Sequence, residues 1–274
     1  MGGTSGIVGR WAGWAAVRLG ATAVIAFMVF PLLYMVLLSL DPDPVGAQGW
    51  PPRISLVNYL ALASPDLGFA RAIGNSLLLS TGTTLVSIAL AVPAAYALAR
   101  LPVPGAGRIL PAMLALAFFP GVILLVTLSR IFTAIGVYDR LPGIGIAQLS
   151  FALPLAVWFL TYAFSQVPND LTDAARLDGA GTRQILLRVV LPIARPGVAA
   201  TVAVVFLASW SDFLFSTGLS QTPRSETLLV LLSKLPVLGF LGGQMAAGVL
   251  MSVPVAVVVG ALLVWLDRRT AHPR

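Results

Sequence analysis

Cysteine is absent from the 274-residue chain, and histidine occurs only once. Without cysteine the chain can form no disulfide, no reactive thiolate and no cysteine-ligated metal site. The single histidine, His272, lies in a polar segment near the C-terminal end, which leaves neither a Ser-His-Asp triad nor a histidine cluster for a metal ion. We therefore predict that the chain has no catalytic residue and no metal site.

Lysine also occurs only once, at Lys234, and no glycine-rich run precedes it. A phosphate-binding loop requires Gly-Lys-Ser/Thr at the start of a helix, after such a run. We therefore expect that ATP does not bind this chain in that manner, and that the chain itself carries no cofactor.

Charged residues are scarce, at 10% of the chain, whereas 58% of the residues are hydrophobic. Soluble domains are about 25% charged, so this composition indicates an integral membrane protein. The net charge is +7, but the charges lie between apolar stretches. We interpret the excess of basic residues as a determinant of topology that also attracts anionic lipid headgroups, and not as a nucleic-acid surface.

The chain contains six long stretches with at most one charge each, and about 20 such residues suffice to cross a bilayer as a helix. We predict an all-α integral membrane protein, with residues 1–274 forming a single transmembrane domain. The expected transmembrane helices cover residues 19–40, 72–99, 109–129, 143–166, 196–218 and 245–266. A secretory signal cleaved near Val45-Gly46-Ala47 is the alternative for the first stretch, but its 22 uncharged residues exceed the 7–15 of a signal core.

Two local features of these stretches bear on their geometry. Prolines tend to kink a membrane helix, although neighbouring groups can satisfy the freed backbone; they occur at Pro31, Pro93, Pro111, Pro120, Pro154 and Pro254. Small residues at three- and four-residue intervals on the second stretch favour close helix packing over a pore lining; they are Ser76, Ser80, Thr83, Ser87, Ala91 and Ala95.

The orientation follows from the basic residues in the connections. One alternating set of connections, which includes both terminal segments, carries 11 basic residues, and the other set carries 6. Since the connections richer in Lys and Arg stay in the cytosol, we expect both termini to be cytosolic.

The longest cytosolic connection is too apolar and too regular to be a simple linker. We expect a short helix capped by Asn169 or Asp170 and ending near Leu177, followed by a break at Gly179 and Gly181. Thr182 is expected to cap a second helix with an apolar face. That face consists of Ile185, Leu186, Val189 and Val190. From physical chemistry alone, this segment either docks into the groove of a partner protein or lies on the lipid surface.

A spaced pattern in this loop favours docking: an acid-Ala-Ala triplet, three residues, Gly, nine residues, an aliphatic residue, one residue, then Leu-Pro. The pattern resembles the cytosolic signature of permease subunits of binding-protein-dependent ATP-binding cassette (ABC) importers. The matching residues are Asp173, Ala174, Ala175, Gly179, Val189, Leu191 and Pro192. Asp173 stands where the family usually has Glu, and Val189 where it usually has Ile.

Further segments resemble the carbohydrate-type permeases related to the maltose system, and in particular the shorter permease of the pair. They are Asn75-Ser76, the run Ala94-Ala95-Tyr96-Ala97-Leu98-Ala99-Arg100, and Trp210-Ser211-Asp212-Phe213. Ser211 departs from the Asn that is usual in these relatives. The resemblance extends from about Leu56 to Leu266.

The resemblance implies a type I ABC importer permease fold with a cytosolic coupling-helix loop over residues 168–195. It implies a non-catalytic subunit of a bacterial plasma (inner) membrane complex that imports a sugar or sugar-like solute. The implied partners are a second permease, a dimer of cytosolic ATPases that bind ATP and Mg, and an extracytoplasmic solute-binding protein or lipoprotein. The residues expected to couple to the ATPase are Asp173, Ala174, Ala175, Asp178, Gly179, Ala180, Leu191 and Pro192.

Asp212 is an acid within an expected span, and such residues normally face a partner or a water-filled cavity. It lies 16 residues after Pro196, about 24 Å along a helix, and therefore towards the outer side. Substrate contact, gating, subunit contact and a structural bond all remain open for it. The candidate substrate-pathway residues are Asn75, Trp210, Asp212 and Phe213, because aromatic faces suit sugar rings but also simply pack.

A self-sufficient secondary transporter or channel is the alternative function, and an integral-membrane enzyme is a third. The sequence argues against both, because it contains one intramembrane acid, no convincing inverted repeat and no cluster of polar or histidine residues at an interface. It does not identify the solute.

Overall fold

The computed structural model describes residues 4–42, 54–235 and 241–270, and every regular element in these ranges is helical. The predicted all-α fold class is therefore confirmed. The chain divides into two compact units, which are described separately. The first comprises Met1–Ser64 and Leu235–Leu250, and the second comprises Pro65–Lys234 and Met251–Arg274.

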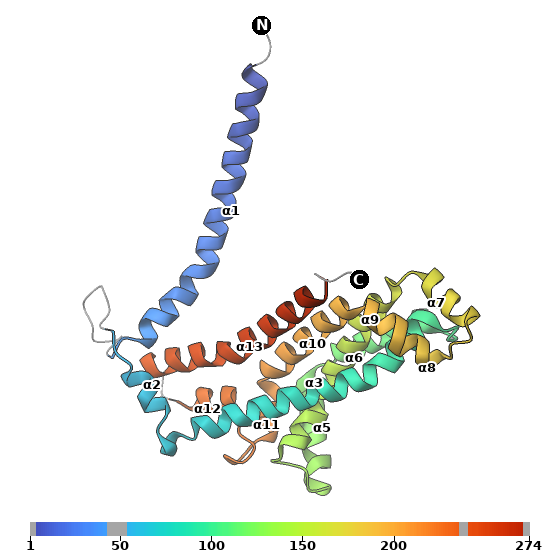
Figure 1. Cartoon of the computed structure of the whole chain (residues 1–274). Coiled ribbons are helices and arrows are strands. Elements are labelled where there is room, and N and C mark those ends of the chain that lie inside the picture. The colour runs from blue at the N-terminus through green and yellow to red at the C-terminus, as the bar shows by residue number, and fades with distance from the viewer. Residues whose placement is uncertain (1–3, 43–53, 236–240, 271–274) are drawn as a thin grey trace. The chain divides into compact units, whose positions relative to one another are not determined.

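Figure 1 shows the helices coloured in chain order, from blue at the N-terminus to red at the C-terminus. They are α1 (Thr4–Ser39), α2 (Val57–Leu62), η1 (Pro65–Leu67), α3 (Phe69–Arg100), α4 (Ala106–Ala117), α5 (Gly121–Ala134), α6 (Leu141–Ser165), α7 (Asn169–Leu177), α8 (Thr182–Ile185), η2 (Leu186–Val190), α9 (Leu191–Ile193), α10 (Arg195–Trp210), α11 (Leu214–Leu219), α12 (Leu228–Lys234) and α13 (Leu241–Thr270). The expected cleavage site at Val45-Gly46-Ala47 and the single histidine lie outside the described residues.

Four helices are each long and apolar enough to cross a membrane unbroken. These segments are Val17–Ser39, Phe69–Arg100, Leu141–Ser165 and Leu241–Arg268. They correspond to the first, second, fourth and sixth expected spans. Two further crossings are possible only if each of two bent helix pairs counts as one span.

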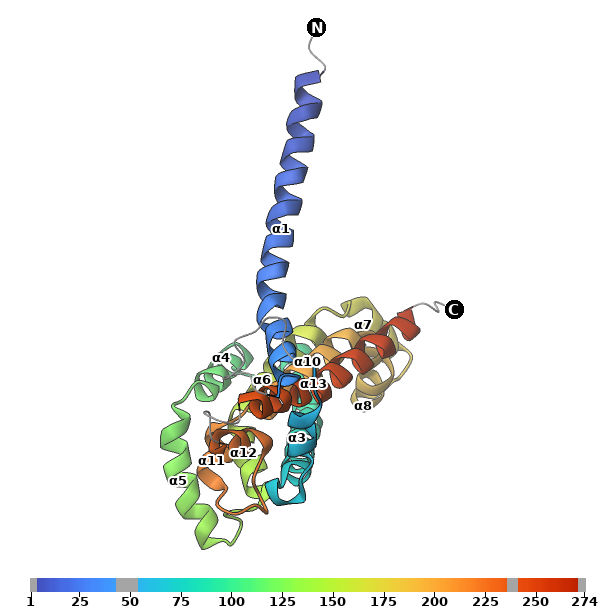
Figure 2. The ribbon, with the colours of Figure 1, turned by 90° about the vertical axis from the view of Figure 1, so that its left-hand side faces the viewer.

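The third expected span, over residues 109–129, is not one helix. It is divided between α4 and α5, whose axes differ by 80°; Figure 2 shows both helices. Pro120 lies in this break, directly before the first residue of α5. Proline lacks an amide hydrogen and disfavours helical backbone in the residue before it. The other five prolines noted in the expected spans lie inside continuous helices.

The fifth expected span, over residues 196–218, is also interrupted. Helix α10 ends at Trp210, and α11 begins only at Leu214. At its other end α10 meets the preceding helical segment Thr182–Ile193 at an angle of 82°. Pro196 occupies the first turn of α10, where its missing amide hydrogen costs nothing.

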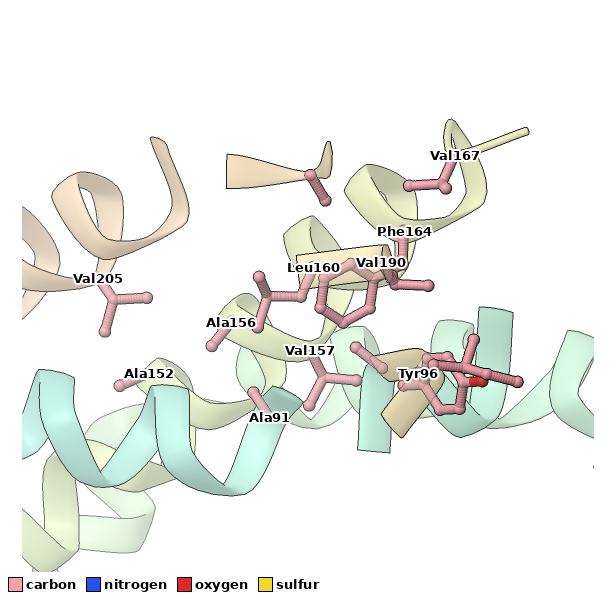
Figure 3. Packing of buried hydrophobic residues seen from close by; sticks show 13 residues of the cluster. Ala91, Tyr96, Ala152, Ala156, Val157, Leu160, Phe164, Val167, Val190 and Val205 are labelled. Carbon is pink, nitrogen blue, oxygen red and sulfur yellow. The ribbon is translucent and has the colours of Figure 1, made fainter. Parts of the chain in front are cut away.

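In the second unit α3, α6 and α10 pack against one another, and α4 packs against α6. All six small residues predicted to pack on the second span are buried, which confirms that prediction. Ala91 and Ala95 of α3 face Ala152 and Ala156 of α6 in the same core cluster, and small side chains allow such close approach. Figure 3 shows larger members of the cluster, including Leu160 and Phe164.

In the first unit Asn58 joins α2 to the end of α1. Its amide nitrogen donates to the carbonyls of Ser39, at 3.0 Å, and Asp41, at 2.8 Å. Ser39 and Tyr59 are hydrogen bonded through their hydroxyls at 2.8 Å. A helix leaves its last carbonyls without intrahelical donors. Asn58 provides the donor for the Ser39 carbonyl, and the Leu37 and Leu38 carbonyls accept from the N–H groups of Leu40 and Asp41.

Candidate functional site

The 168–195 loop contains the predicted first helix, because α7 spans Asn169–Leu177. The expected cap was wrong: Pro168 precedes the helix, and no side chain caps it. The side-chain oxygen of Asn169 instead accepts a hydrogen bond from Nη1 of Arg100. Asn169 therefore connects α7 to the end of α3 and does not cap α7. Figure 1 shows α7 and α8 together at one end of α3 and α6.

The second predicted helix begins at Thr182, which is its first residue and not its cap. Gly181 takes the cap position, and its backbone N–H donates to Oε1 of Gln184 at 3.0 Å. The helix continues through the π-helical segment η2 into α9. The predicted apolar face is confirmed, since Ile185 and Val190 are buried in the core cluster and the other two residues pack against it.

The residues expected to couple to an ATPase fall into two groups. Asp173, Ala174, Asp178 and Gly179 are exposed. The other four, which are partly buried and support the loop, are Ala175, Ala180, Leu191 and Pro192. Three of these four, all except the proline, pack against the core cluster.

The most exposed large apolar side chain of the loop is Leu177, at 90% exposure, and Leu171 on the same helix is 46% exposed. Neither is in the expected coupling set. Beside them Asp173 and Arg176 form an exposed ion pair at 2.7 Å. We call the exposed set Leu171, Asp173, Ala174, Leu177, Asp178 and Gly179 the docking face. Leu171 and Leu177 are the exposed apolar side chains of this set, and the other four residues are small or acidic.

Gly179 ends α7 in a left-handed conformation, with φ of +82°. A side chain other than glycine is disfavoured there, and Asn and Asp are the least disfavoured alternatives. Among the described residues, and apart from the two chain neighbours of Gly179, no heavy atom lies within 4 Å of the position that a Cβ would take. The space in front of Gly179 is therefore open to a partner.

A buried polar cluster lies between α3, α6 and α10, and its centre is Gln148. The side chain of Gln148 is fully buried. Its Oε1 accepts hydrogen bonds from the hydroxyls of Thr83, at 3.1 Å, and Ser209, at 2.5 Å. Its Nε2 donates to the Ser209 carbonyl at 3.4 Å and to Oδ2 of Asp212 at 3.1 Å. Both hydrogens and both lone-pair positions of the amide are thus used.

Asp212 occupies the break between α10 and α11. Its carboxylate accepts hydrogen bonds from the backbone N–H groups of Phe215, at 3.4 Å, and Ser216, at 3.2 Å, and from the Ser216 hydroxyl at 3.3 Å. These amides are orphan donors of the first turn of α11. Asp212 therefore caps α11 and links it to Gln148, which is the arrangement expected of a structural bond.

The other residues proposed for the substrate pathway lie in different surroundings. Trp210 is 4% exposed and stacks on Phe206 with ring centroids 5.8 Å apart. Its Nε1 has no hydrogen-bond partner within the described ranges. Phe213 is 46% exposed. The amide of Asn75, at the start of α3, donates to the carbonyls of Arg224, at 3.2 Å, and Glu226, at 2.8 Å. Direct substrate contact by any of the four stays a prediction.

Asn75 anchors the 220–227 loop at two carbonyls, and Asp139 anchors it at four further groups. Asp139 adopts a left-handed backbone with φ of +56°. Its carboxylate accepts hydrogen bonds from the Gln221 N–H at 2.7 Å, the Thr222 N–H at 3.0 Å, the Thr222 hydroxyl at 2.6 Å and the Ser225 hydroxyl. Partial desolvation raises the pKa of Asp139, but these hydrogen bonds outweigh it and hold the pKa well below its usual range.

Gln148 and Asp139 were missed by the sequence analysis for different reasons. Gln148 is uncharged, and counting charge-free stretches does not register it. A glutamine within an otherwise apolar run was the available signal, because buried amides in a membrane helix require partners. Asp139 was counted only as a charge in a connection. Its partners lie more than 80 residues away, so no local signal identified them.

Comparison with known proteins places this geometry in context. A family model described as "Binding-protein-dependent transport system inner membrane component" matches residues 3–272. The trehalose transport system permease protein SugB of Mycobacterium tuberculosis is 33% identical over 249 residues, covering 87% of this chain and 89% of that protein. The trehalose/maltose transport system permease protein MalG of Thermococcus litoralis is 29% identical over 246 residues, covering 88% of each.

A solved structure shows the same fold. It is the crystal structure of a bacterial ABC transporter involved in the import of the acidic polysaccharide alginate, and one of its chains superposes with a TM-score of 0.74. The match covers 93% of this chain and 95% of that chain at 23% sequence identity. At this identity the likeness concerns the fold.

Proposed function

The chain belongs to the family of binding-protein-dependent transport system inner membrane components, so it is a permease subunit of an ABC importer, and we propose that its solute is a sugar. The observation that carries the proposal is the 33% identity to a trehalose permease over 87% of this chain. A second relative of similar coverage is named for trehalose and maltose. The resemblance to carbohydrate-type permeases stated from the sequence agrees with both.

The mechanism we propose is alternating access driven by a separate ATPase that binds the docking face. ATP binding by that ATPase favours one arrangement of the spans, and it does so only as far as the ATPase binds the two arrangements with different affinity. The exposed Leu177 and the open space at Gly179 support this role for α7. On this proposal the loop itself performs no chemistry.

The partners we propose are a second permease, two copies of a cytosolic ABC ATPase and an extracytoplasmic solute-binding protein or lipoprotein. The family description names a binding protein as part of the transport system. ATP and Mg belong to the ATPase, and this chain carries no cofactor or catalytic residue. It is a multi-pass protein of the inner membrane, and we propose that both termini, and with them α7, face the cytosol, as the basic residues indicate.

The test is purification of the chain from native membranes in mild detergent, with every accompanying protein identified by mass. We expect a P-loop ATPase and a second multi-pass permease. The binding protein, once identified, is then screened by thermal shift with trehalose, maltose and an amino acid as the non-sugar control. Recovery of a stable chain alone would contradict the importer assignment, and stabilisation only by the amino acid would contradict the sugar.

A further inference from the structure

Arg100, the last residue of α3, binds the turn that leads from α6 into the 168–195 loop. Its Nε donates to the Phe164 carbonyl at 3.0 Å, and Nη2 donates to the same oxygen. Nη2 also donates to the Val167 carbonyl, and Nη1 donates to Oδ1 of Asn169. The guanidinium thus binds three oxygen atoms at once.

The three acceptors belong to three consecutive segments of the chain. Phe164 lies in the last turn of α6, Val167 lies in the connection that follows, and Asn169 is the first residue of α7. Carbonyls in the last turn of a helix lack intrahelical donors and carry partial negative charge, so a cation is favourable there. A single side chain of α3 therefore fixes the turn between α6 and α7.

Apolar packing holds the other end of the loop. Ile185 and Val190 are buried in the same core cluster as Tyr96 of α3 and Leu160 of α6; Figure 3 labels Tyr96, Leu160 and Val190 of this cluster. The loop is thus attached to α3 and α6 at its start by the guanidinium and at its end by side-chain packing. A displacement of α7 cannot be absorbed at either end without breaking one of these attachments.

We propose that Arg100 is a positioning residue that makes α7 and the adjoining ends of α3 and α6 move as one body, so that movement of the ATPase reaches the spans. This inference rests on the proposed function, because it presumes that the docking face binds an ATPase. The geometry requires the planar guanidinium of arginine. A lysine ammonium is a point charge on a flexible stem, and it cannot reproduce the simultaneous hydrogen bonds to Phe164, Val167 and Asn169.

A matched control is available in the next helix. Arg108, in α4, belongs to the same connection and is exposed. Within the described ranges it makes no side-chain hydrogen bond. If Arg100 acted only as a basic residue that sets topology, Arg100→Lys would behave as wild type. If it acts by its contacts, Arg100→Lys and Arg100→Ala would share a defect that Arg108→Ala lacks.

The first measurement uses the whole importer reconstituted in liposomes, with uptake of the radiolabelled sugar that the binding protein selects in the screen above. For Arg100→Ala and Arg100→Lys we expect normal recovery of the ATPase but at least about a fivefold loss of sugar transported per ATP hydrolysed, the lower range of allosteric coupling. Arg108→Ala should match wild type. An unchanged ratio in Arg100→Ala, or a wild-type ratio in Arg100→Lys, would overturn the proposal.

The second measurement follows the attachment itself and needs no sugar. Because the chain lacks cysteine, two cysteines can be introduced and spin labelled in the same chain. One replaces Asp170 of α7 and the other replaces Leu90 of α3, both of which are exposed. We expect one narrow distance distribution with or without ATP, and a broad, nucleotide-dependent one in Arg100→Ala. Equal distributions in both proteins would refute the rigid attachment.

The outcomes separate the two proposals. Loss of the complex in both Arg100 variants would also overturn the positioning role, because it would make Arg100 a requirement for folding. By contrast, normal transport by a variant that blocks the docking face would contradict the proposed function and leave the distance measurement intact.

Discussion

Replacing Gln148 by Met tests whether the buried polar cluster holds the broken fifth span together. Methionine is unbranched and similar in size, so the substitution removes the amide and leaves little cavity. It deprives the Thr83 and Ser209 hydroxyls of their acceptor and Asp212 of one donor. Asp212 keeps its three contacts with the start of α11.

The expected loss follows from the number of hydrogen bonds. Four contacts of the Gln148 amide disappear, and side-chain hydrogen bonds in membrane proteins contribute about 0.6 kcal/mol on average and up to about 1.7. We therefore expect the free energy of unfolding to fall by about 2 to 4 kcal/mol. The control is Thr84→Val, because the Thr84 hydroxyl donates only to the carbonyl of Ser80 on its own helix. Its loss should cost under about 0.5 kcal/mol.

The assay is unfolding of the purified chain in mild detergent with increasing dodecyl sulfate, followed by fluorescence of its six tryptophans. A double-mutant cycle with Thr83→Val isolates one contact, and we expect a coupling energy of about 1 kcal/mol between Thr83 and Gln148. Additivity of the two single substitutions would refute the network. A loss equal to that of Thr84→Val would do so as well.

Three further predictions concern other parts of the chain. Gly179→Asp should keep the helix end, because Asp tolerates a left-handed backbone, but should cut sugar uptake per ATP at least about tenfold, measured in liposomes; normal transport would contradict the docking face. Gly143→Ala would place a Cβ 2.3 Å from the Val137 carbonyl oxygen and should lower the free energy of unfolding by about 1–3 kcal/mol. The control Gly145→Ala, whose Cβ would have no described atom nearer than 3.4 Å, should lower it less. Equal melting temperatures of the two variants would contradict the close packing at Gly143. Because the pKa of folded Asp139 is depressed, its ionised form contributes stability that is complete above the unfolded pKa of about 3.9 and is lost as the pH falls through the folded pKa. The free energy of unfolding of the wild type should therefore exceed that of Asp139→Asn by a constant amount from pH 7 to about 4, and by less at lower pH. A difference that stays constant on acidification would exclude this contribution of the ionised carboxylate.

The sequence determined the features that depend on local pattern. The lengths of the uncharged stretches predicted an all-α membrane protein, because each charge at membrane depth costs several kcal/mol whatever the fold. The spacing from Asp173 to Pro192 indicated the permease family, and the family match confirms it. The extent of α7 was also predictable, because Gly179 ends a helix through its own backbone freedom.

The tertiary structure decided which side chains meet across long separations. Arg100 lies 64 residues from Phe164, and Asn75 lies 151 residues from Glu226. In the sequence Arg100 is a charge at the end of an expected span, and no nearby residue identifies its partners. The break after Trp210 was missed because an apolar run looks alike whether a helix continues or bends. The break after Ala117 lies at Pro120, one of six prolines that the sequence offered as kinks without distinguishing a sharp bend from a continuous helix. The role of Asp212 was likewise left open by its residue type, since an acid at membrane depth requires partners that only the packed helices supply.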